Sequence, residues 1–136
     1  MNARRIASLV AVLALVATVA NAGPTPTRGW QKTIKLEVTK AGVDVNAQAL
    51  AVIGKKNGVE YFGVRVFANL KDGTVLTVMG EDKAGNRYMI GTMEIFLTSA
   101  DLYLESKTNP SDVFPVLALA RVSVDFGADE IVFGSF

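Results

Sequence analysis

Alternating apolar and polar residues dominate the chain from Trp30 onward. Apolar side chains recur at every second position in three long stretches: Ile34–Val38, Val43–Ala51 and Phe62–Leu70. A period of two places successive side chains on opposite faces of a β-strand, so each stretch is predicted to be a strand with one buried face. No stretch between Trp30 and Phe136 has a convincing helical period. The pattern therefore predicts an all-β domain.

Turn signals separate these strands. Asn57-Gly58 and Asp72-Gly73 are residue pairs that tight hairpin turns favour, because such turns require a positive φ at both central positions. A polar connection, Glu81–Asn86, leads into the next strand. We place a further turn near Thr98-Ser99, because Arg87–Ser106 is too long for one ordinary strand. About eight strands at this spacing predict a single antiparallel β-sandwich of the Greek-key or immunoglobulin-like kind.

The last third of the chain continues the same pattern less regularly. Lys107–Asp112 is predicted to be a loop, and Val113–Ala120 is apolar without alternation. Val122–Phe126 and Ile131–Phe136 are predicted to be the closing strands, with a turn between them. Apolar aromatic rings favour the interior. We therefore expect all the phenylalanines in the core, namely Phe62, Phe67, Phe96, Phe114, Phe126, Phe133 and Phe136.

The first 22 residues have the three parts of a secretory signal peptide. A basic start with Arg4 and Arg5 precedes the apolar run Ile6–Ala20, and small residues follow at Ala20-Asn21-Ala22. The run is shorter than the ~20 apolar residues that a membrane-spanning helix needs. We therefore expect a secreted or periplasmic protein that is cleaved after Ala22 and keeps no membrane span. Residues 23–29 are expected to be a flexible leader, and residues 30–136 the domain.

Composition narrows the chemistry. The 136 residues include 14 basic and 13 acidic ones, and loss of two arginines with the signal peptide would leave a net charge of −1. This balance gives no reason to expect a nucleic-acid partner. The chain has no histidine and no cysteine, which excludes disulfides, imidazole and thiolate catalysis, and zinc sites built on nitrogen and sulfur. Without disulfides, the domain must be stabilised by burial of its apolar side chains, whether or not it is exported.

The remaining acidic residues form no recognised motif for catalysis or metal binding. Two loops hold side-chain oxygens of the kind that bind calcium. The first contains Glu81, Asp82 and Asn86, and the second contains Asp125, Asp129 and Glu130. Neither has the alternating spacing of a calcium loop, and no nucleophile or phosphate-binding motif occurs. We therefore expect a protein without enzymatic activity and without a cofactor.

One strand offers a candidate binding surface. Asp101, Tyr103 and Glu105 alternate with apolar residues, so they share the outward face of their strand. A flat ring with polar neighbours suits a sugar or a protein partner. Trp30, Tyr61 and Tyr88 are further aromatic candidates, although cross-strand packing is the ordinary use of such rings. The plain solvent side of a half-buried strand is the alternative interpretation of the whole surface.

Sheet edges are a second route to partners, including self-association. Four residues are expected to guard such edges: Lys35, Glu37, Arg65 and Pro115. The aromatic end of the chain at Phe136 also fits the last strand of an eight-stranded outer-membrane β-barrel, although Glu130 and Gly134 interrupt the apolar alternation of such a strand.

The region from Phe62 to Phe136 resembles a strand-and-turn pattern of small secreted bacterial all-β proteins. The residues that carry the resemblance are Val64–Val78, Ile90–Thr92, Ala100–Ser106, Val113–Leu117, Val122–Val124 and Ile131–Phe136. The order is also similar to secreted sandwich domains of the chordin-repeat type, which are related in shape to copper–zinc superoxide dismutase. Those domains carry a histidine motif that is absent here, so the resemblance implies a fold and no metal or redox role. The sequence thus predicts an exported sandwich with a structural or binding role, with a barrel or a carbohydrate-binding module as alternatives.

Overall fold

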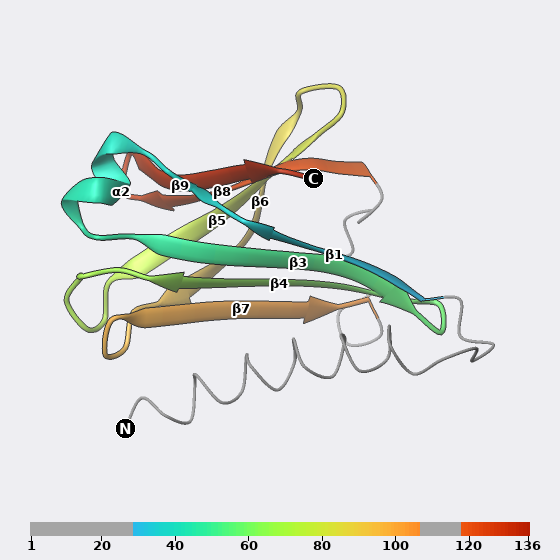
Figure 1. The fold of residues 1–136 in the computed structure, drawn as a ribbon, viewed down its shortest axis with the longest axis horizontal. Helices are drawn as coiled ribbons and strands as arrows, with labels where there is room; N and C mark the ends of the chain where they lie inside the picture. The colour runs from blue at the N-terminus through green and yellow to red at the C-terminus, as the bar shows by residue number, and fades with distance from the viewer. Residues whose placement is uncertain (1–28, 107–117) are drawn as a thin grey trace.

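The computed structural model describes residues 29–106 and 118–136, and within these ranges the chain forms two antiparallel sheets (Figure 1). Sheet A has the strand order β1-β3-β4-β7 and comprises β1 (Trp30–Lys35), β3 (Gln48–Lys56), β4 (Val59–Phe67) and β7 (Ser99–Glu105). Sheet B has the order β2-β9-β8-β5-β6 and comprises β2 (Glu37–Val38), β9 (Asp129–Ser135), β8 (Leu119–Phe126), β5 (Val75–Asp82) and β6 (Arg87–Glu94). The two sheets stack, which confirms the predicted all-β sandwich.

The core lies between the sheets and is built from alternate residues of the strands. In β4, for example, Phe62, Val64 and Val66 are at most 1% exposed and point into the core. The facing side chains from sheet B include Leu76, Val78, Val122, Val124 and Val132, all fully buried. Removal of this apolar surface from water is the main stabilising contribution in a domain without disulfides.

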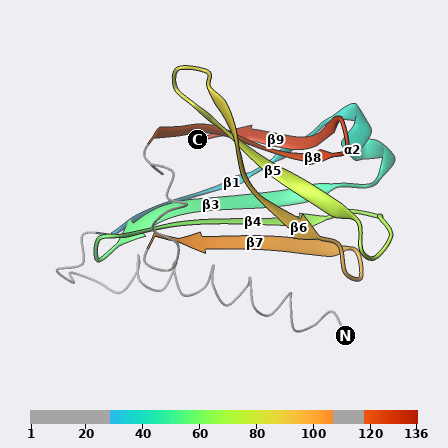
Figure 2. The same ribbon diagram turned by 180° about the vertical axis from the view of Figure 1, so that it is seen from behind.

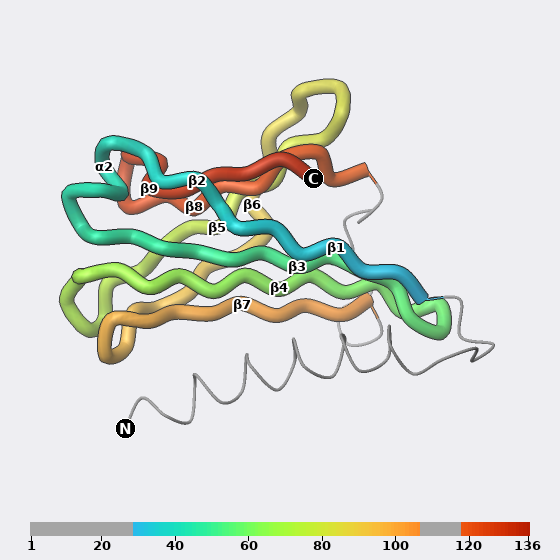
Figure 3. Tube along the Cα trace, viewed as in Figure 1, coloured from blue at the N-terminus to red at the C-terminus, as the bar shows by residue number. Residues whose placement is uncertain are grey.

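One predicted strand is shared between the two sheets. β1 belongs to sheet A and β2 to sheet B, and only Leu36 separates them (Figure 3). The Leu36 amide still donates to the Ala49 carbonyl at 2.9 Å, while its side chain is 2% exposed and lies beside Gly134 of β9. The crossing raises the number of strands in the described residues to nine, against about eight expected.

A short helix, α2 (Lys40–Asp44), replaces the beginning of the strand predicted over Val43–Ala51. The prediction is wrong as far as Ala47 and right from Gln48, where β3 begins. The alternation of apolar and polar residues predicted a strand here, because a helix of five residues is too short to show a helical period.

The local cause of the helix is a cap and a close contact. Thr39 accepts a hydrogen bond from the Gly42 amide at 3.1 Å, which satisfies one of the free donors at the helix start. Gly42 lies so close to the Ile131 carbonyl that any side chain at this position would overlap it. A glycine is therefore needed where α2 packs on β9.

Two tight hairpins use the same turn with different residues. Between β3 and β4, Asn57 and Gly58 have φ values of 51° and 78°, as predicted. Between β6 and β7, Leu97 and Thr98 have φ values of 48° and 64°, and Phe96 and Ser99 on either side of them exchange backbone hydrogen bonds. The turn lies close to the predicted position. Holding a non-glycine residue in the left-handed region costs on the order of 1 kcal/mol or more, so the second hairpin is the strained one.

The connection at Asp72-Gly73 is not the hairpin that its residues suggest. β4 lies in sheet A and β5 in sheet B, so residues 68–74 cross between the sheets. Figure 2 shows β5 and β6 running at an angle in front of the strands of sheet A. Glycine at position 73 has a φ of 89°, which the crossing turn requires.

Several sequence predictions fall outside the described residues. These are the signal peptide, the leader, the loop at 107–112, most of the apolar segment 113–120, and the residues Phe114 and Pro115. Within residues 29–106 and 118–136, no helix has the length and apolar character needed to span a membrane.

The expectation that every phenylalanine lies in the core is wrong for four of the six that the structure describes. The Phe133 ring lies under the Arg121 guanidinium, 4.8 Å from the ring centroid, and does not pack against the core. Phe62 is fully buried and Phe136 packs against the core. Phe67, Phe96 and Phe126 are instead 36, 37 and 39% exposed. Phe67 and Phe96 each follow a buried residue, Val66 and Ile95, so alternation itself turns them outward. Phe126 would point inward with Val124, but the register shift between Val124 and Asp125 turns it out.

A candidate binding face on sheet A

The outward face of sheet A is a regular array of side chains. Its strands pair without any register shift, so residues on this face line up in rungs with one residue from each of β1, β3, β4 and β7. The three central rungs are Gln31–Gly54–Tyr61–Glu105, Thr33–Val52–Gly63–Tyr103 and Lys35–Leu50–Arg65–Asp101. The three candidate residues of β7 therefore share one face, as expected, and each occupies its own rung.

Tyr103 is held in place by its neighbours on this face. Its hydroxyl donates to Glu105 Oε1 at 2.7 Å, and its ring edge lies beside Gly63 of β4. Burial raises the pKa of Tyr103, and the hydrogen bond to the Glu105 carboxylate raises it further. The half-buried ring therefore stays neutral at physiological pH.

Tyr61 repeats this arrangement one strand away. The hydroxyl end of its ring occupies the space directly above Gly54, where any side chain would overlap it. Its hydroxyl also lies 3.5 Å from the Trp30 carbonyl oxygen, and burial raises the pKa of Tyr61. The side chain is only 6% exposed, because its neighbours on the outward face cover it. Tyr61 therefore packs within the face and offers little ring surface to a ligand.

Arg65 and Asp101 form the charged rung. Arg65 is 4% exposed although it points away from the core, and its guanidinium lies 3.8 Å from Asp101 Oδ2. The guanidinium also stacks on the Phe67 ring at 5.4 Å from the centroid. Burial lowers the pKa of Arg65, and the Asp101 charge opposes that shift. The prediction of Arg65 as an edge guard is wrong, because β4 is an interior strand, whereas Lys35 and Glu37 do lie in edge strands.

The face also contains acceptor oxygens that lack donors. Within the described part of the chain, Asp101 Oδ2 and Gln31 Oε1 are buried and accept no hydrogen bond. Gln31 was missed by the sequence analysis because no alternation argument marks an isolated glutamine. A buried acceptor without a donor costs about 1–3 kcal/mol, so a ligand with hydroxyl or amide donors would gain by meeting these oxygens.

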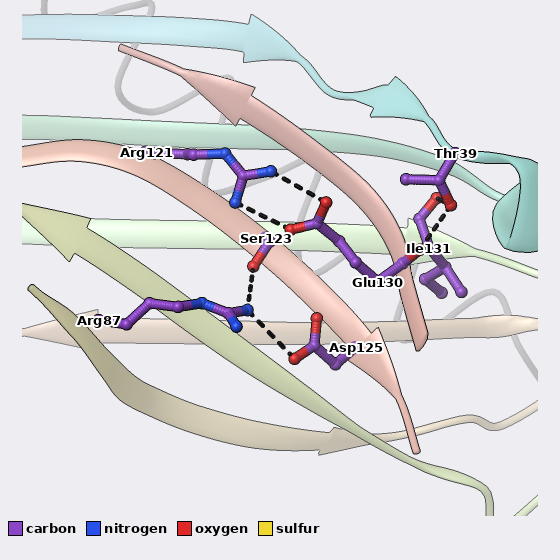
Figure 4. Close-up of polar contacts among 7 residues, drawn as sticks. All are labelled: Thr39, Arg87, Arg121, Ser123, Asp125, Glu130 and Ile131. Carbon is purple, nitrogen blue, oxygen red and sulfur yellow. Dashed lines mark hydrogen bonds and ion pairs between the residues drawn. The ribbon is translucent and has the colours of Figure 1, made fainter. Parts of the chain in front are cut away.

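The outward face of sheet B holds a different set of polar contacts (Figure 4). Arg121 binds Glu130 through two oxygens, at 2.8 and 2.9 Å, and Arg87 reaches Asp125 Oδ2 at 3.4 Å and Ser123 Oγ at 3.3 Å. Burial raises the pKa of Asp125. The charges of this face are thus matched to one another, which is the ordinary arrangement of a structural surface.

In the acidic loop between β5 and β6, the Asp82 carboxylate accepts hydrogen bonds from the loop's own residues. Asp82 Oδ1 accepts from the Ala84 and Asn86 amides, both at 2.9 Å, and Oδ2 accepts from Asn86 Nδ2 at 3.0 Å. These hydrogen bonds, with the one from Asn86 Nδ2 strongest, lower the pKa of Asp82. Across residues 29–106 and 118–136, no group of three or more acidic residues lies close enough to hold a metal ion.

Three features occur together on the outward face of sheet A, whereas that of sheet B shares only the last of them, through Asp125 Oδ1. They are a half-buried tyrosine beside a glycine, a buried arginine paired with a partly exposed aspartate, and buried acceptor oxygens that accept no hydrogen bond. The arrangement can bind a neutral molecule that has both an apolar surface and hydrogen-bond donors. Comparison of the chain with protein-family models, with curated proteins and with solved structures found no match.

Proposed function

We propose that the protein is an exported β-sandwich that binds a saccharide on the outward face of sheet A. The observation that carries the proposal is the presence of two buried oxygens that accept no hydrogen bond, Gln31 Oε1 and Asp101 Oδ2, on the same face as the Tyr103 ring. Asp101 Oδ2 has only the Arg65 guanidinium, 3.8 Å away, as its partner. Sugars supply hydroxyl donors for such oxygens and C–H surfaces for an aromatic ring.

The dimensions of the face suit an oligosaccharide. Gln31 and Asp101 lie on the two edge strands of sheet A, about 14 Å apart across the sheet and two rungs, or about 13 Å, apart along it, which gives a diagonal of about 19 Å. A chain of a few sugar units covers that distance. The export part of the proposal is supported by the basic start, the apolar run and the small residues that precede Gly23.

A glycan array with the domain starting at Gly23 tests the binding part. We expect binding to at least one oligosaccharide class, lost in Tyr103→Ala and reduced about tenfold in Asp101→Asn, since loss of a buried acceptor costs about that much. Met89→Ala is the matched control, because Met89 is 63% exposed on the other sheet.

Circular dichroism of each variant separates misfolding from lost binding. A folded protein that binds no glycan, or a folded Tyr103→Ala variant that binds as well as wild type, would contradict the proposal. Export is tested separately by expressing the full chain and sequencing the N-terminus of the protein outside the cytoplasm, which we expect at Gly23. An N-terminus at Met1 would contradict that part alone.

A further inference from the structure

One end of the sandwich exposes most of the large apolar side chains on the surface. Nine such residues are exposed in the described part of the chain, and seven of them lie on or beside the connections at the end where α2 is found. We define the apolar end as Val43, Phe67, Val75, Phe96, Leu97 and Phe126, which are 36–63% exposed. Apolar residues gathered in this way usually mark an interaction surface.

The apolar end is tied together by hydrogen bonds between separate connections. The Ala68 amide donates to the Thr98 carbonyl at 3.0 Å, and the Asn69 amide donates to the Val45 carbonyl at 2.7 Å. The Leu97 amide donates to Asp72 Oδ1 at 2.8 Å. A surface held in one arrangement loses little conformational entropy when it binds.

Backbone strain in the hairpin at the apolar end indicates that Leu97 is kept there for binding and not for stability. The same two-residue turn is made from Asn57-Gly58 at one end of the sandwich and from Leu97-Thr98 at the other. Asn-Gly adopts this turn readily, whereas leucine and β-branched threonine are held there against their preference. Stability alone would therefore favour Asn-Gly in both hairpins. The second hairpin instead presents Leu97, 41% exposed, at its tip.

The charges around the apolar end point to a basic partner. The connections and strand ends there have two lysines, Lys40 and Lys71, against four acidic residues, Asp44, Asp72, Glu94 and Asp129. The end therefore has a net charge of −2, while the domain from Gly23 onward has −1. Anionic lipid surfaces and a second copy of the same end would both be repelled.

We propose that the apolar end docks a partner protein through an apolar patch bordered by lysine or arginine. An apolar centre with a charged rim is the usual composition of protein interfaces. The acidic rim favours a partner whose surface is positively charged. The docking surface adjoins the saccharide face at Phe67, whose ring stacks on the Arg65 guanidinium, so a glycan and a partner protein would bind side by side.

A synthetic amphipathic helix of leucine and lysine serves as the probe, and its leucine–glutamate counterpart is the control. Fluorescence anisotropy with the domain from Gly23 to Phe136 should show binding of the basic peptide alone. Affinity should fall severalfold between low and high salt, because rim charges are screened. Asp44→Asn with Asp129→Asn should weaken binding and flatten this salt dependence.

The decisive variant is Leu97→Asn with Thr98→Gly, which installs the relaxed turn. We expect its melting temperature to rise by a few degrees, because turn strain is relieved, while peptide binding falls at least tenfold. Met89→Asn, at an exposed apolar residue elsewhere, should leave binding unchanged.

Three results would overturn the proposal. The first is equal binding of the acidic peptide. The second is unchanged peptide binding by the relaxed-turn variant. The third is sedimentation of the domain with phosphatidylcholine or phosphatidylglycerol vesicles, lost in the same variant, together with no peptide binding. That outcome would assign the apolar end to a lipid surface.

Discussion

The two sheets use glycine on opposite faces. In sheet A, Gly54 and Gly63 point outward, and a tyrosine from the neighbouring strand fills the space beside each. In sheet B, Gly80, Gly91 and Gly134 point into the core and make room for large side chains, namely Ile90, Leu119 and Tyr88 at Gly80, Leu102 at Gly91, and Leu36 and Ile34 at Gly134. The same residue thus shapes a surface in one sheet and the interior in the other.

The sheets also differ in regularity. All three pairings in sheet A run without a register shift. In sheet B, the pairings β5–β6, β5–β8 and β8–β9 each contain one. Bulges increase the local twist and bend a sheet around its core. Sheet A therefore remains an even array on which a ligand can lie, while sheet B takes up the curvature.

The largest effect is expected for Gly80→Ala in sheet B. An added methyl group would come within 3.0 Å of Ile90, Leu119 and Tyr88, so the core must shift. We expect the free energy of unfolding to fall by about 1–3 kcal/mol, as is typical of an overpacked core. Urea denaturation measures the change, and a loss below about 0.5 kcal/mol, the scale of ordinary surface substitutions, would show that the core tolerates the methyl group.

A smaller effect is expected for Gly54→Ala in sheet A. The methyl group would displace the hydroxyl end of Tyr61, which can turn away from the sheet, and would press on the Trp30 carbonyl oxygen at 2.7 Å, so the edge strand β1 must shift slightly. Alanine in a strand gains about 0.5–1 kcal/mol over glycine, which offsets part of this cost. We expect a net change below about 1 kcal/mol together with a more accessible Tyr61. Chemical iodination of tyrosine measures that accessibility. A cost equal to that of Gly80→Ala would remove the distinction between the two faces.

Glu130→Gln tests whether the polar contacts on sheet B contribute to stability. The substitution removes the charge from the two-oxygen contact with Arg121, and both side chains are 28% exposed. Ion pairs near the surface contribute about 0.2–1 kcal/mol, and we expect a loss in that range, smaller still at high salt. A loss well above this range, unchanged by salt, would assign the pair a buried structural role.

Ionisation of the tyrosines is expected to change the free energy of unfolding least at neutral pH. The change grows as the solution becomes alkaline. Burial raises the pKa of Tyr61, Tyr88 and Tyr103 above the ordinary value of about 10. The folded state therefore holds these protons more tightly than the unfolded state. This contribution to stability is complete below pH ~10 and is lost as the pH rises through the folded-state pKa values.

Absorbance at 295 nm, followed with circular dichroism, tests the tyrosine prediction. We expect less phenolate at pH 10 than the half ionisation of an ordinary tyrosine, and a joint rise of phenolate and loss of β-structure above it. All the tyrosines of the chain are included, so no other phenol contributes to the signal. Full ionisation near pH 10 with the fold intact would show that the phenols are open to water.

The candidate face could be predicted from the sequence only along one strand. Alternation placed Asp101, Tyr103 and Glu105 together, because side chains two positions apart share a face. It could not show that Gln31 and Arg65 lie on the same face, because strand order and register bring them there across as many as three strand spacings. No local signal encodes which strand lies beside which.

The sequence by itself determined the strand content, the Asn57-Gly58 hairpin and the absence of histidine and cysteine chemistry. These follow from local periodicity, turn preference and residue type, which need no partner elsewhere in the chain. Only the tertiary structure decided that residues 40–44 form a helix, that Asp72-Gly73 crosses between sheets, and that Phe126 turns outward after a register shift. Each of these depends on contacts between distant residues, such as Gly42 on Ile131, whose energies no local pattern contains.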